Sequence, residues 1–87
     1  MLHASHPEIQ KRLKRAHGHL AKVIEMIERE DPCKDIAQQL RAVESAVTKA
    51  KVALIHDHVG HCLADAADNP SDRAAQLAEF REITRYL

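Results

Sequence analysis

The strongest constraint in this sequence is an unbroken helical pattern over residues 32–65, which is too long for an 87-residue chain to bury alone. Apolar side chains recur there at alternating steps of four and three, as in a helix and not in a strand. They are Ile36, Leu40, Val43, Val47, Ala50 and Leu54. Asp31 is the expected N-cap and Pro32 suits the first helical position, where a missing N–H costs nothing. The predicted helix is roughly 50 Å long at 1.5 Å per residue.

The two ends of this helix carry the side chains that bind soft metal ions. Cys33 lies in the first turn, where the positive end of the helix dipole favours a thiolate. His58 and Cys62 are four residues apart near the other end, so they share one face. An imidazole and a thiolate at this spacing form half of a metal site, and a third ligand is needed to complete it.

The third ligand cannot come from the same chain if the helix is straight. Cys33 and His58 are 25 residues apart, which is roughly 38 Å along a helix. Two antiparallel copies would place Cys33 of one chain beside His58 and Cys62 of the other, with a two-fold axis near residue 46 or 47. We therefore expect an isologous dimer with two equivalent sites. The alternative is that Cys33 is merely a small apolar residue and His58 a charge near a helix end.

The rest of the chain predicts a single all-α domain over residues 1–87. We expect a flexible arm at 1–6 and helices at about 7–29, 32–65 and 71–86. The acidic connection at 28–31 is short, so the first two helices should be antiparallel neighbours. The apolar seam of the first helix is Ile9, Leu13, Ala16, Leu20, Val23, Ile24 and Ile27. The third helix has Leu77, Phe80, Ile83 and Leu87 on one side and should cover the end of the bundle next to His58 and Cys62.

Charge is distributed unevenly although the formal net charge is zero. Residues 1–29 carry a net charge of +3 and residues 57–87 a net charge of −3. Within the first helix, KRLKR at 11–15 can neutralise DNA phosphates, although a solvated helix face is the alternative. Lys49 near the middle of the long helix would extend this patch in a symmetric dimer. Lys51 adds to this positive charge, whereas His17 and His19 are expected to be plain surface residues.

Further ligands are available at the two ends of the chain. His3, together with a free amino terminus, could hold a square-planar Cu(II) or Ni(II) ion, or could simply belong to a tail. His6 is a spare ligand. Glu79 or Glu82 could accept a hydrogen bond from the second nitrogen of a ligand histidine, or could remain plain surface carboxylates.

Several functional classes are disfavoured. The sequence has no Gly-rich phosphate loop, no nucleophile elbow and no acid/base carboxylate pair, so we do not expect an enzyme. It has no signal peptide, transit peptide or run long enough to span a membrane, which favours the cytoplasm. Cysteines stay reduced there, and two cysteines among clustered histidines favour metal or thiol chemistry over a disulfide.

Four motifs carry a resemblance to a known family: HPEIQKRLKRAHGHL, the Pro-Cys opening of the second helix, QQLRAVESAV and HDHVGHCL. With them the chain resembles, over nearly its whole length, the CsoR/RcnR/FrmR group of small all-helical bacterial repressors. The most specific element is the Cys-His-Cys pattern, which falls on Cys33, His58 and Cys62. In the copper-responsive branch of the family this pattern is a Cu(I) site shared between two chains.

The resemblance implies an assembly and a partner. Members of the family form antiparallel dimers that usually pair into a flat homotetramer. They bind operator DNA in the metal-free form and release it when the effector binds. The matching DNA-contact positions are Arg12, flanked by Lys11, Lys14 and Arg15, and Lys49. Two departures are Pro32, where copper sensors often have tyrosine, and Glu44, where arginine is common.

Comparison of the branches favours Cu(I) as the effector. The arm with His3 is similar to the nickel/cobalt branch, which however has histidine at the position of Cys62. The formaldehyde branch lacks this second cysteine, and the persulfide-sensing branch lacks the histidine at the position of His58. We therefore expect a Cu(I)-sensing repressor. The same fold sensing Ni(II), Co(II), Zn(II), formaldehyde or a persulfide is the alternative, and a cytosolic metal-buffering protein without DNA binding is an alternative of another class.

Overall fold

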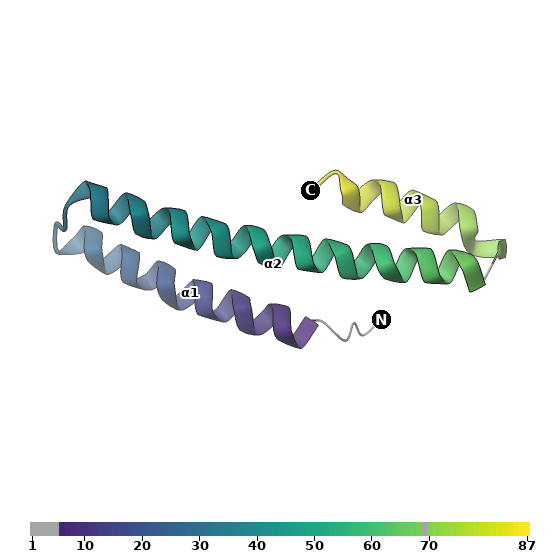
Figure 1. Ribbon diagram of the computed structural model, residues 1–87, viewed down its shortest axis with the longest axis horizontal. Helices are drawn as coiled ribbons and strands as arrows, with labels where there is room; N and C mark the ends of the chain where they lie inside the picture. The colour runs from purple at the N-terminus through teal and green to yellow at the C-terminus, as the bar shows by residue number, and fades with distance from the viewer. Residues whose placement is uncertain (1–5, 69) are drawn as a thin grey trace.

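The computed structural model of the protein describes residues 6–68 and 70–87, apart from the side chain of residue 66. These residues form α1 (His6–Glu28), α2 (Cys33–Asp68), a short 3-10 turn η1 (Pro70–Asp72) and α3 (Arg73–Thr84), as Figure 1 shows. The predicted all-α fold with three helices is therefore confirmed. The long helix extends three residues beyond the predicted end, and residues 1–5 of the predicted arm lie outside the described part of the chain.

The three helices lie side by side in one layer. In Figure 1, α1 runs along the first half of α2 and α3 folds back along its last part. The Cα atoms span 59 × 23 × 13 Å, and the shortest extent is about the diameter of one helix. The radius of gyration is 17.9 Å, against about 12 Å for a compact chain of this length. The described residues thus provide no second layer to cover the two broad faces.

This flat arrangement buries only part of each predicted apolar seam. The buried part consists of Ile9, Ala16, Val23, Val43 and Ala50. Among the described elements α1 contacts only α2, so these residues close the α1–α2 hairpin. Of the remaining seam residues Ile36 is half-buried, and the others are 38% to 56% exposed: Leu13, Leu20, Ile24, Ile27, Leu40, Val47 and Leu54. Apart from Ile24, the exposed residues repeat every seven residues on each helix, as the buried ones do, which is the pattern of helices that pack against neighbours on more than one side.

The turn between α1 and α2 has the hydrogen bonds of a Schellman motif. The N–H of Asp31 donates to the carbonyl of Met26 at 2.9 Å, and the N–H of Glu30 donates to that of Ile27 at 3.1 Å. Glu30 has a φ of 60°, a left-handed conformation that glycine usually supplies at this position. The chain therefore reverses direction within a few residues, as the short connection predicted.

The start of α2 differs slightly from the prediction. The Asp31 carboxylate accepts hydrogen bonds from Nε of Arg29 at 3.0 and 3.1 Å, so it is engaged with the preceding residue. The Pro32 carbonyl accepts from the N–H groups of Asp35 and Ile36. As a result α2 begins at Cys33, one residue later than predicted, and Cys33 occupies its first position.

We predict that Glu30→Gly stabilises the protein by about 1 kcal/mol, because a left-handed conformation is strained for any residue with a Cβ. Glu25→Gly is the matched control, since the same exchange inside α1 should destabilise by about 1 kcal/mol. Urea unfolding at one fixed protein concentration measures both changes. Equal destabilisation by the two substitutions would contradict this reading of the turn.

Candidate metal centre

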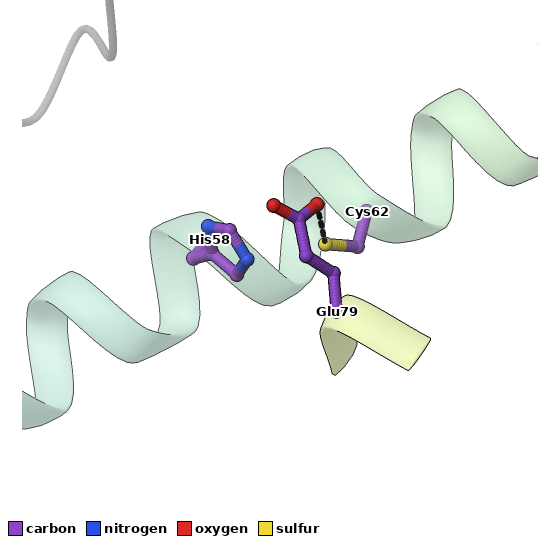
Figure 2. A group of neighbouring side chains, drawn as sticks. All are labelled: His58, Cys62 and Glu79. Atoms are coloured by element: carbon purple, nitrogen blue, oxygen red, sulfur yellow. Dashed lines mark hydrogen bonds between the residues drawn. The ribbon is translucent and has the colours of Figure 1, made fainter. Parts of the chain in front are cut away.

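The C-terminal part of α2 and the facing side of α3 bring three potential metal ligands together. His58 and Cys62 come from α2 and Glu79 comes from α3, and one ligand atom of each lies within 4.8 Å of the others. Figure 2 shows the Glu79 carboxylate directed toward the His58 ring and the Cys62 thiol. Cys62 is only 3% exposed, His58 is half-buried and Glu79 is exposed. The pair formed by His58 and Cys62 is therefore protected on one side and accessible on the other.

Local sequence explains why these side chains meet. A spacing of four places His58 and Cys62 one turn apart on the same side of α2. On α3 the half-buried residues are Gln76, Phe80, Ile83 and Thr84, which mark the side that packs on α2. Glu79 is three residues after Gln76 and lies at the edge of this side. Packing of α3 on α2 thus buries Cys62 and places the carboxylate of Glu79 beside it.

The Cys62 thiol is held in its protonated form. Burial raises the pKa of Cys62, and the nearby carboxylates of Glu79 and Asp65 raise it further because a thiolate would add a third negative charge. The thiol donates a weak hydrogen bond to Oε2 of Glu79 at 3.9 Å. A cation at this position would replace the thiol proton, since only the thiolate is a good metal ligand. Glu79 then remains as a neighbouring negative charge that favours a bound cation.

The structure does not bring the remaining predicted ligands to this pair. Cys33 is exposed at the opposite end of the same continuous helix, and a rise of 1.5 Å per residue separates it from His58 by roughly 38 Å. Glu82 lies 3.7 Å from the guanidinium of Arg85, in an exposed ion pair. His6 begins α1, and His3 lies outside the described residues. One chain therefore presents two of the three expected ligands at one place, accompanied by Glu79.

The candidate DNA-binding residues are all exposed. Arg12 and Arg15 of α1 and Lys49 of α2 line one hollow between the two helices, with a volume of about 310 Å³. Lys11 and Lys14 do not line it. The basic patch of the first helix and the lysine of the second are thus already joined within a single chain.

His19 is the residue whose surroundings the sequence did not reveal. It is half-buried, it lines the same hollow, and its Nε2 lies 2.6 Å from Oε1 of Gln39 on α2. A usable signal was the polar series Glu8, Arg12, Arg15 and His19, whose steps of four, three and four place it along one side of α1.

A single helical layer with three potential metal ligands near one end and a basic groove between two helices is the arrangement expected of a small metal-responsive helical regulator. The chain matches the family described as "Metal-sensitive transcriptional repressor" over residues 5–86, and it belongs to this family. The resemblance to the CsoR/RcnR/FrmR group is thereby confirmed.

No helix in the described residues is both long and apolar enough to cross a membrane.

Individual relatives point to the same family. The copper-sensing transcriptional repressor CsoR of Bacillus subtilis (strain 168) is 39% identical over 81 residues, which cover 90% of this chain and 80% of that protein. The protein of the same name from Mycobacterium ulcerans (strain Agy99) is 38% identical over 64 residues, or 74% of this chain and 55% of that one. The structure of the nickel-responsive transcriptional regulator InrS aligns with a TM-score of 0.86 and 28% identity, covering 100% of this chain and 98% of that one.

We predict that alkylation of the reduced, metal-free protein modifies Cys33 before Cys62, because the Cys62 thiol is buried and protonated. Glu79→Gln removes one of the charges that raise the pKa of Cys62, so it should increase the rate at Cys62 by about two- to tenfold. Glu82→Gln removes the same charge one turn away and is the control. Mass spectrometry of timed samples measures both rates, and equal effects of the two substitutions would contradict the assigned role of Glu79.

Proposed function

We propose that this protein is a Cu(I)-responsive transcriptional repressor that binds operator DNA without metal and releases it when Cu(I) binds. The site would consist of Cys33 from one copy and His58 and Cys62 from a second copy. The observation that carries this proposal is the split of the ligands between the two ends of α2, with an exposed apolar row between them. This function is a cytoplasmic one, where thiols stay reduced, and it involves no enzymatic activity.

The exposed row on α2 has the symmetry that the site requires. It consists of Leu40, Val47 and Leu54, so it is centred on Val47. If two copies pack antiparallel with a two-fold axis at Val47, Leu40 of one lies opposite Leu54 of the other. The same operation places Cys33 opposite residue 61, beside Cys62 and within one turn of His58. One rotation therefore covers the apolar row and completes two identical sites.

Burial supplies a reason for this pairing. Exposed apolar rows of this extent mark interaction surfaces, and α1 adds a second row through Leu13, Leu20 and Ile27. Each such side chain contributes up to about 2 kcal/mol when a partner covers it completely. Together the two rows form the inner faces of a four-helix bundle, and pairing of dimers would give the homotetramer implied by the family resemblance.

The ligand set supports copper as the effector. Two thiolates and one imidazole suit Cu(I), a soft ion for which Cys ligands are selective. The relatives from Bacillus subtilis and Mycobacterium ulcerans are copper-sensing repressors. Nickel is the second candidate, because the fold matches that of the nickel-responsive InrS along the whole chain. A square-planar Ni(II) ion would need a fourth ligand, for which Glu79, His6 or His3 is available. Co(II) and Zn(II) are further candidates that would bind to the same ligands.

The fold suggests how the site and the DNA-binding residues communicate. Cys33 begins α2 and follows directly on the tight turn from α1, so any displacement of this end moves α1 as well. Cys33 must approach His58 and Cys62 of the second copy when they share an ion. That approach shifts Arg12 and Arg15 on α1 relative to the second copy and changes the surface offered to DNA. The coupling equals the difference in metal affinity between the two states, typically about 1–3 kcal/mol.

The shared site is tested by mixing two defective variants. Cys33→Ala and Cys62→Ala each destroy every complete site in a homodimer. A heterodimer of the two retains one complete site, built from Cys33 of one chain and His58 and Cys62 of the other. We predict that refolding an equal mixture restores high-affinity Cu(I) binding, at about one ion per two dimers, since half of the random pairs are mixed. Competition with a Cu(I) chelator measures it, and absence of restored binding would exclude a site between chains.

DNA release is tested with a duplex that the metal-free protein selects from a random-sequence library. We predict that saturating Cu(I) weakens binding of this duplex by about 5- to 150-fold, as measured by fluorescence anisotropy at fixed salt. The Cys62→Ala variant should bind the duplex with an affinity that Cu(I) does not change. Unchanged binding of the wild type at saturation would reject Cu(I) as the effector, and a parallel titration with Ni(II) tests the second candidate. Failure to enrich any duplex would favour the metal-buffering alternative.

A further inference from the structure

The hollow between α1 and α2 has the composition of a phosphate-binding groove. Its positive lining consists of Arg12 and Arg15 from α1 and Lys49 from α2, while Glu8 is its acidic residue. Glu8 lies 3.8 Å from Nε of Arg12 and both side chains are exposed, so this pair is weak and open to exchange. Ala16, Ala46 and His19 complete the lining, and the two alanines are its smallest residues. Their small side chains leave room between the cations.

His19 lies at the boundary of this groove and is fixed in orientation. It also lines the adjoining hollow of about 380 Å³, to which Gln39 belongs. Its Nε2 lies 2.6 Å from Oε1 of Gln39. In the tautomer that carries its hydrogen on Nε2, the ring donates to this amide oxygen, and Nδ1 is the nitrogen that a second proton would occupy. His19 can therefore add a positive charge to the groove without giving up its contact with α2.

The charges around His19 are mainly positive. Those lining the two hollows are Glu8, Arg12, Arg15, Lys22, Glu25 and Arg29 from α1 and the following turn, and Lys49 from α2. α3 contacts α2 but not α1 among the described elements. A phosphate is drawn to such a concentration of cations, and its negative charge in turn favours the protonated form of a neighbouring imidazole.

We propose that His19, oriented by Gln39, is a further DNA-binding residue that takes up a proton when the groove between α1 and α2 receives a backbone phosphate. The proposal rests on the DNA binding proposed above and adds a residue and a proton to it. DNA binding is then linked to pH. Because histidines ordinarily lose their charge as pH rises, we expect the contribution of this side chain to DNA affinity to be greater at low pH than at high pH.

The test compares His19→Ala with His17→Ala on the duplex selected above. His17 is exposed, lies two residues away on the same helix and lines neither hollow. Anisotropy titrations at about pH 6 and about pH 8 bracket histidine titration. We expect the wild type and His17→Ala to gain at least about threefold more affinity at the lower pH than His19→Ala. At about pH 6 we also plot the logarithm of the DNA association constant against the logarithm of the salt concentration. The slope should be shallower by about 0.9 for His19→Ala than for the wild type and His17→Ala.

A second variant separates the charge of His19 from its structural role. His19→Gln keeps a polar side chain that can contact Gln39 but cannot become a cation, so it should behave like His19→Ala in both readouts. Circular dichroism and Cu(I) affinity confirm that each variant is folded. Equal pH dependence in all proteins, or a loss of affinity with no change in salt slope, would overturn the proposal while leaving the repressor function intact. No binding by the wild type itself would instead overturn both.

Discussion

The single-layer arrangement of α1, α2 and α3 is the constraint on which the other properties of this protein depend. A layer of helices 13 Å thick cannot enclose a core. It buries the apolar residues between neighbouring helices and leaves the next row of apolar residues uncovered. That row on α2 is centred on Val47, midway between Leu40 and Leu54. In the proposed dimer, a second copy that covers this row would gain burial and complete the metal site in the same step, so stability and ligand binding would act through one surface.

Separation of the ligands is what makes such a site responsive. A site built wholly within one rigid helix would bind an ion without moving anything. Here His58 and Cys62 are fixed by α3, whereas Cys33 is attached to the turn that leads into α1. Occupation of the proposed site therefore reports on how two long helices lie relative to each other. Glu79 adds to this arrangement because it favours the protonated thiol when the site is empty and a cation when it is filled.

Much of the fold followed from the sequence, and the exceptions have physical reasons. Steps of four and three identified the helices and the pairing of His58 with Cys62, because helical periodicity fixes which residues share a side. The same steps did not show that Leu40 would be exposed while Val43 is buried, since this depends on where the neighbouring helix lies. The polar series on α1 places His19 on the same side as Arg12 and Arg15 but does not identify Gln39 as its partner, because that contact joins two helices. Glu79 was expected beside a ligand histidine, and the hydrogen bond that it accepts from the Cys62 thiol was not predicted, because it depends on how α3 packs on α2.

Cross-linking at the proposed two-fold axis tests the central claim most directly. In a Cys33→Ser/Cys62→Ser background, Val47→Cys lies opposite its own copy, so mild oxidation should give a covalent dimer. Leu40→Cys should not link to itself, because the two copies of this residue are roughly 21 Å apart along the helices. It should link to Leu54→Cys in a mixture of the two proteins. Efficient self-linking of Leu40→Cys, or none of Val47→Cys, would contradict the antiparallel pairing.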